Sequence, residues 1–199
     1  MKNKIKPIAF YLPQYHTIPE NDLWWGNGFT EWTNVKKAKP NFKGHYQPHI
    51  PNSYYDLTDP KVMKQQAELA QKYGLYGFCF YWYWFNGKQV LEKPVYNFKD
   101  STIEFPYCLC WANENWTRTW DGQDHDVLLK QDYQKENLSH EFIERIIPFL
   151  KDKRYILYEG KPLLLIYKAN IIPNIKELIS KWRAEALKHG LKGLTIAAV

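Results

Sequence analysis

Amide, carboxylate and guanidinium side chains stand between tryptophans in one short stretch of this 199-residue sequence. Glu114 has an asparagine on each side, Asn113 and Asn115, and Arg118 follows closely. Sugars present flat CH faces that stack on aromatic rings, and hydroxyl groups that hydrogen-bond to such polar side chains. The stretch therefore predicts a carbohydrate-binding site. The other residues of this stretch that we expect to contact substrate are Trp111, Trp116, Trp120 and Asp121.

Glu114 is the natural catalytic candidate in this stretch. Glycosidic-bond chemistry commonly uses two carboxyl groups, one as acid or base and the other as nucleophile or base. An aromatic, partly dry setting raises the pKa of a glutamate toward the working range. The alternative is that Glu114 pairs with Arg118 and only stiffens the loop. Glu31 is the leading second carboxyl, and its alternative role is that of a solvated loop carboxylate.

Two further segments, 13–32 and 81–87, carry a similar mixture of aromatic and polar residues. Of Trp82 and Trp84, we expect one to lie in the core and the other in the site, so that only one of them touches ligand. His16 is a candidate for hydroxyl binding or proton transfer, whereas a lone histidine is more often structural. The substrate-binding residues expected in these segments are Gln14, His16, Trp24, Trp25, Trp32, Tyr81, Trp82 and Trp84.

No metal ion or cofactor is expected. Cys79, Cys108 and Cys110 fall in apolar runs, and two nearby thiols without a second Cys or His pair make an incomplete zinc site. Their odd number favours free, buried thiols in a reducing compartment. His45 and His49 are four residues apart but lie in a proline-rich loop, which makes them poor metal ligands.

Parallel strands are the elements that must position these segments, because ligands bind at the carboxyl ends of parallel strands. Apolar and aromatic runs predict five strands, at residues 5–12, 75–84, 105–112, 162–167 and 194–199. Helices are predicted at 58–74, with Thr58 as N-cap, at 136–150 and at 173–189. Segment 13–55 has no sustained period, and its large aromatic residues favour an ordered functional loop over disorder.

Strands that alternate with helices indicate an α/β fold with a parallel sheet. We expect a single domain, residues 1–199, built as a (β/α) TIM-type barrel of which only about the first five strands are present. A complete barrel typically needs about 250 residues. The last strand then has an unpaired edge, so the chain would need a partner or would be a gene fragment. A doubly wound open sheet is the competing topology, disfavoured because no glycine-rich phosphate loop follows a strand.

The overall composition excludes some partners. The net charge of +6 comes from dispersed lysines, without a basic run typical of nucleic-acid arms. The apolar stretch at the N-terminus is too short for a secretory signal, and no segment approaches the roughly 20 apolar residues that span a bilayer. We therefore expect a cytoplasmic protein with possible peripheral membrane association and no nucleic-acid partner.

Motifs along nearly the whole chain resemble the glycosyltransferase WbsX-like family. They are AFYLPQYH (9–16), EN (20–21), WWG (24–26), FTEW (29–32), GHYQP (44–48), YDL (55–57), GFCFYWYWF (77–85) and WANENW (111–116). The resemblance implies a role in bacterial surface polysaccharide, such as O-antigen in lipopolysaccharide or capsule. It also implies a barrel similar to that of the endo-mannosidase-like hydrolases of family 99, in a domain longer than this chain.

Three functions follow from these features. The first is an enzyme that forms or remodels glycosidic bonds in surface polysaccharide. Its substrate would be an oligosaccharide or polysaccharide, and an activated sugar donor is a further candidate partner. The second is a glycoside hydrolase acting on the same polymer. The third is a non-catalytic carbohydrate-binding remnant, suggested by the incomplete barrel.

Overall fold

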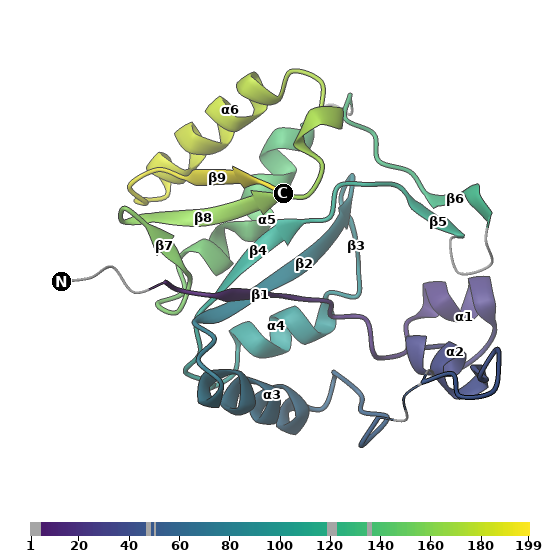
Figure 1. The fold of residues 1–199 in the computed structure, drawn as a ribbon. Helices are drawn as coiled ribbons and strands as arrows, with labels where there is room; N and C mark the ends of the chain where they lie inside the picture. Colours follow the sequence, from purple (N-terminus) through teal and green to yellow (C-terminus); the bar gives the residue numbers. More distant parts are fainter. Residues whose placement is uncertain (1–4, 47–48, 50, 119–122, 135–136) are drawn as a thin grey trace.

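Five parallel strands form the centre of the molecule. The computed structural model describes residues 5–46, 49, 51–118, 123–134 and 137–199 (Figure 1). The strands are β1 (Ile8–Tyr11), β2 (Gly77–Phe85), β4 (Tyr107–Trp111), β8 (Lys161–Ile166) and β9 (Thr195–Ala198). Each pairs in parallel with the next along the chain, so the strand order follows the sequence without a reversal. This order is that of a barrel, because a doubly wound sheet reverses its strand order at a switch point. The five predicted strands are confirmed.

A single layer of helices covers one face of this sheet. The helices between the strands are α3 (Pro60–Lys72), α4 (Lys93–Lys99), α5 (Leu138–Leu150) and α6 (Ile175–Lys188), with a short 3-10 turn, η2 (Ala169–Ile171). The predicted helices at 58–74, 136–150 and 173–189 are confirmed as α3, α5 and α6. Asp59, and not the expected Thr58, caps α3, because its side chain accepts a hydrogen bond from Lys61 N.

Aromatic side chains on alternate residues of β2 form much of the core. Phe78, Phe80, Trp82 and Trp84 all face the helices and are at most 5% exposed. The Trp84 ring meets the Phe142 ring of α5 with centroids 5.4 Å apart. This arrangement follows from the two-residue period of a strand.

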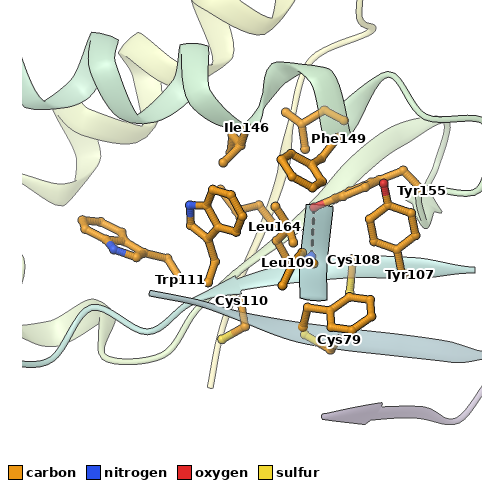
Figure 2. Close-up of a cluster of buried hydrophobic side chains, with 14 of the residues drawn as sticks. Cys79, Tyr107, Cys108, Leu109, Cys110, Trp111, Ile146, Phe149, Tyr155 and Leu164 are labelled. Carbon is orange, nitrogen blue, oxygen red and sulfur yellow. Dashed lines mark hydrogen bonds between the residues drawn. The ribbon is translucent and has the colours of Figure 1, made fainter. Parts of the chain in front are cut away.

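Strand β4 contributes its own buried residues to the same core. Leu109 and Trp111 point toward the helices, and Leu109 N–H donates to the buried Tyr155 hydroxyl at 3.0 Å (Figure 2). Cys79, Cys108 and Cys110 are free and buried, and in Figure 2 Cys79 and Cys110 point away from the helix-covered face. The prediction of buried free thiols is confirmed.

Short helices and strands lie in the connections between the main strands and helices. They are α1 (Pro19–Trp25), α2 (Glu31–Lys37), β3 (Lys88–Val90), the hairpin of β5 (Trp116–Arg118) with β6 (Gln123–Leu129), and β7 (Leu157–Tyr158). Helices α1 and α2 lie within segment 13–55, so that segment contains ordered structure. None of the helices in the described ranges combines the length and apolarity needed to cross a membrane.

Candidate functional site

A pocket of about 740 Å³ opens at the carboxyl ends of β2, β4 and β8. Its walls come from the ends of these three strands, from the chain after β1 and from the β5–β6 hairpin with the residues that follow it. Six of the expected site residues line it, namely Gln14, Tyr81, Asn113, Glu114, Asn115 and Trp116. The pocket therefore lies at the strand exits, where the sequence predicts a site, and its role as a carbohydrate site stays a prediction.

Glu114 lies in the pocket and is paired with a lysine from the next strand exit. Its side chain is 41% exposed, and Oε1 lies 2.5 Å from Lys168 Nζ. The pairing raises the pKa of Lys168, chiefly because Glu114 accepts its hydrogen bond. The expected alternative, a pair between Glu114 and Arg118, is wrong: Arg118 bonds Asp126 at 2.9 Å and donates to Trp24 O at 3.0 Å.

Asn113 ties the exits of β4 and β8 together. The side chain is fully buried; its Nδ2 donates to Lys168 O at 2.8 Å and its Oδ1 accepts from Lys168 N at 2.8 Å. Nδ2 also donates to the Tyr133 hydroxyl. These contacts fix the backbone of Lys168 beside Glu114. Asn115 likewise holds a neighbouring backbone segment, since its Oδ1 accepts a hydrogen bond from Gln131 N at 2.8 Å.

Tyrosines on the inner face of β2 form an aromatic wall of the pocket. The rings of Tyr81 and Tyr83 are stacked with centroids 6.1 Å apart, and Trp116 meets Tyr83 edge to face at 5.1 Å. Gln14 Nε2 donates to the Tyr83 hydroxyl at 2.8 Å. Burial raises the pKa of Tyr81 to about 12, so its hydroxyl keeps its proton at neutral pH and can donate to a ligand.

Glu31 has a different environment from Glu114. It lies in the first turn of α2, is 5% exposed, and its Oε2 has no hydrogen-bond partner among the described residues. Burial raises its pKa to about 7. Glu31 is not among the described residues that line the pocket. Burial is the main cause that raises the pKa of Tyr83, and the charges of Tyr81 and Glu31 add to it.

The residues expected from segment 13–32 have mixed positions. Trp24 approaches Trp116 of the pocket, with ring centroids 6.3 Å apart. Trp25 stacks on Phe29, and Trp32 donates its Nε1 proton to Tyr55 O at 2.7 Å, so both serve packing in this structure. His16 is 2% exposed, and its ring nitrogens have no partner within the described chain. Burial lowers its pKa, which favours a neutral ring.

Three of the expected site tryptophans belong to the core. Trp82, Trp84 and Trp111 are at most 1% exposed and pack against the helices, away from the pocket. The expected division of Trp82 and Trp84 between core and site is wrong, because residues two apart in a strand share a face. Trp120 and Asp121 lie outside the described residues.

Sequence reasoning missed several pocket residues, chiefly Tyr83, Tyr133, Tyr167 and Lys168. Tyr83 shares the face of Tyr81 by the two-residue period. Tyr167 is the last residue of the strand predicted at 162–167 and Lys168 directly follows it, so the rule applied to the other strand exits would have found them. Tyr133 follows the β5–β6 hairpin, which no clear pattern in the sequence predicts.

Comparisons with known proteins agree on the family and the fold. The family model described as "Glycosyltransferase WbsX" matches residues 7–199. The chain is 46% identical over 195 residues to the "Uncharacterized protein WxcX" of two strains of Xanthomonas campestris pv. campestris. That alignment covers 96% of this chain but 28% of those relatives, so the chain spans little more than a quarter of their length.

Solved structures share the fold at low sequence identity. A GH99 endo-alpha-mannosidase from Bacteroides thetaiotaomicron superposes with a TM-score of 0.52 at 15% identity, over 83% of this chain and 46% of the other. A structure described as a glycoside hydrolase-like protein gives a TM-score of 0.56 at 14% identity, over 100% of this chain and 52% of the other. The partial coverage agrees with the incomplete barrel seen here. With a family match over almost its entire length, the chain belongs to the glycosyltransferase WbsX family.

Proposed function

We propose that this chain is part of a carbohydrate-active enzyme that forms or remodels glycosidic bonds in bacterial surface polysaccharide. The observation that carries the proposal is Glu114, which lies in a pocket with an aromatic wall at the carboxyl ends of three parallel strands. Stacking rings and polar donors match the two kinds of surface that a sugar presents. The family description, a glycosyltransferase, supports transfer of a glycosyl group. An activated sugar donor and a cytoplasmic location are further parts of the proposal.

The two glutamates suit different roles in such chemistry. Glu114 is held by Lys168 and points into the pocket, which suits a nucleophile, a base or a group that stabilises positive charge on the sugar. Burial raises the pKa of Glu31 to about 7, so a large fraction of this carboxyl is protonated near neutral pH, which suits an acid. We propose Glu31 as the second carboxyl; the alternative is a carboxylate from outside these 199 residues.

A hydrolase is the second candidate, and the fold shared with an endo-alpha-mannosidase favours it. A hydrolase releases reducing sugar with water alone, whereas a transferase needs an activated donor. Assays with and without nucleotide sugars separate the two. Binding without turnover in either assay would favour the third candidate, a non-catalytic carbohydrate-binding segment.

The direct test measures binding and turnover of surface-polysaccharide fragments by the wild-type chain and by Glu114→Gln. Trp116 lines the pocket and the ring of Trp24 lies 6.3 Å from it, so intrinsic fluorescence can report binding. We expect Glu114→Gln to lower turnover by about 10²–10⁴-fold, as for loss of a group that transfers protons, while binding changes little. Glu68→Gln, on the exposed surface of α3, is the matched control.

Two outcomes would contradict the proposal. Unchanged turnover in Glu114→Gln would remove this residue from the chemistry. Failure of the wild-type chain to bind any fragment would remove the carbohydrate site itself.

A further inference from the structure

Histidine and glutamate side chains meet on the outer surface between α5 and α6. Donor atoms of His140, Glu144 and Glu185 all lie within 4.8 Å of one another. His189 lies beside them, with Nε2 2.7 Å from Glu144 Oε1 and 3.8 Å from Glu185 Oε1. His140 and Glu144 are four residues apart on α5, as are Glu185 and His189 at the end of α6. Residues at this spacing share a helix face, so each helix presents one imidazole and one carboxylate to the other.

We propose that His140, Glu144 and Glu185 bind a divalent transition-metal ion, with Zn²⁺ the best match, and that His189 positions Glu144. Imidazole nitrogen suits zinc, copper and nickel, whereas calcium and magnesium prefer oxygen ligands alone. Zinc takes His nitrogen and carboxylate oxygen at about 2.0–2.2 Å. Donors already within 4.8 Å therefore reach one ion through small side-chain rotations.

The three donors are fully or partly exposed. His140 is exposed and makes no hydrogen bond or ion pair to any other described residue, so its ring is free to coordinate. His140 and Glu185 also line a groove of about 660 Å³ between the two helices, which gives an ion access and leaves room for coordinated water. Glu185 engages Lys188 through its Oε2 at 2.9 Å, which leaves Oε1 to face the ion.

His189 would hold Glu144 in place beside the metal ion without binding the ion itself. A carboxylate that coordinates a metal is commonly held by a second hydrogen bond, and loss of that bond typically weakens metal affinity about 10–100-fold. His189 supplies such a bond to Glu144. The ion would join α5 to α6, so it should stabilise the fold without entering the sugar pocket, which lies at the strand ends.

The test uses the tag-free chain after removal of metals with a chelator. Calorimetric titration with ZnCl₂ measures affinity, and thermal unfolding measures stabilisation, since a ligand that binds only the folded state raises Tm. We expect His140→Ala and Glu185→Gln to weaken zinc binding by at least about tenfold and to abolish the rise in Tm, with His189→Ala about tenfold weaker than wild type. MgCl₂ should leave Tm unchanged.

Two controls separate this site from adventitious binding. Glu177→Gln removes a carboxylate from α6 outside the cluster, and His45→Ala removes a histidine elsewhere; both should bind zinc as the wild type does. The proposal is overturned if the wild-type chain binds no zinc. It is also overturned if His140→Ala and Glu185→Gln bind zinc with wild-type affinity. No sugar takes part in these measurements, so their outcome is independent of the proposed function.

Discussion

At the scale of single residues, two glutamates acquire opposite properties from their surroundings. Glu114 is partly exposed and ion-paired with Lys168, whereas Glu31 is buried in the first turn of α2 with an unpartnered oxygen. Burial without a partner disfavours the charged form, which raises the pKa of Glu31 to about 7. Glu114 therefore has a cation beside its negative charge, whereas Glu31 has a pKa close to neutral pH and exchanges its proton there.

This difference predicts a pH-dependent effect of Glu31→Gln on stability. The folded chain holds the Glu31 proton up to a pKa of about 7, whereas the unfolded chain releases it near the ordinary value of 4.5. Wild-type stability therefore falls as pH rises from about 4.5 to 7, by up to roughly 3 kcal/mol at about 1.4 kcal/mol per pKa unit. Glutamine does not ionise, so the stability of Glu31→Gln relative to wild type should increase across this window.

Urea unfolding of both proteins between pH 5 and pH 8 measures this effect. The exposed Glu68→Gln should follow the wild-type profile throughout. Parallel profiles for Glu31→Gln and wild type would show that the Glu31 carboxyl does not carry a raised pKa.

At the scale of elements, strand β2 serves two purposes with its two faces. Trp82 and Trp84 pack against the helices, while Tyr81 and Tyr83 face the pocket. Successive side chains of a strand point to opposite sides, so one aromatic run supplies both the core and the wall of the site. The stability of the sheet and the shape of the pocket thus depend on the same nine residues.

Two tryptophan substitutions should separate these purposes. Trp84→Ala removes a fully buried ring that contacts Phe142 and should lower the free energy of unfolding by about 3–5 kcal/mol. Trp116→Ala removes a half-buried ring of the pocket; it should weaken sugar binding about tenfold, with a much smaller loss of stability. Denaturant unfolding and fragment titration measure the two effects. Wild-type stability in Trp84→Ala would contradict the assignment of this indole to the core.

At the scale of the whole molecule, the sheet is open at both sides. Among the described residues, β1 pairs only with β2, and β9 pairs only with β8. The inner face near β1 also exposes Phe10 and Leu12, by 49% and 45%. Unpaired strand edges beside exposed apolar side chains favour pairing with another chain.

The 199-residue chain should therefore associate with itself as its concentration rises. Light scattering coupled to size-exclusion chromatography measures this across a concentration series. Phe10→Ser, on the open edge strand, should shift the series toward monomer, whereas Leu23→Ser, which removes an 82% exposed side chain in α1, should not. A monomer at every concentration would contradict the prediction.

Sequence patterns alone predict the five parallel strands, the three longer helices and the aromatic, polar character of the strand exits. These features depend on local periodicity and composition, which are readable without contacts. The same two-residue periodicity places Trp82 and Trp84 on one face of the strand. The expectation that one lies in the core and the other in the site therefore contradicts this periodicity. Helices α1 and α2 escaped detection because seven residues are too few to show a helical period.

Which side chains meet depends on how distant segments of the chain pack together. Glu114 pairs with Lys168, 54 positions along the chain, and not with the nearby Arg118. His140 and Glu185 approach each other because α5 and α6 pack side by side, although neither helix alone suggests a metal site. Such pairs depend on the register of adjacent strands and the packing of the helices that follow them. That information comes from long-range contacts throughout the core, and no local stretch of sequence contains it.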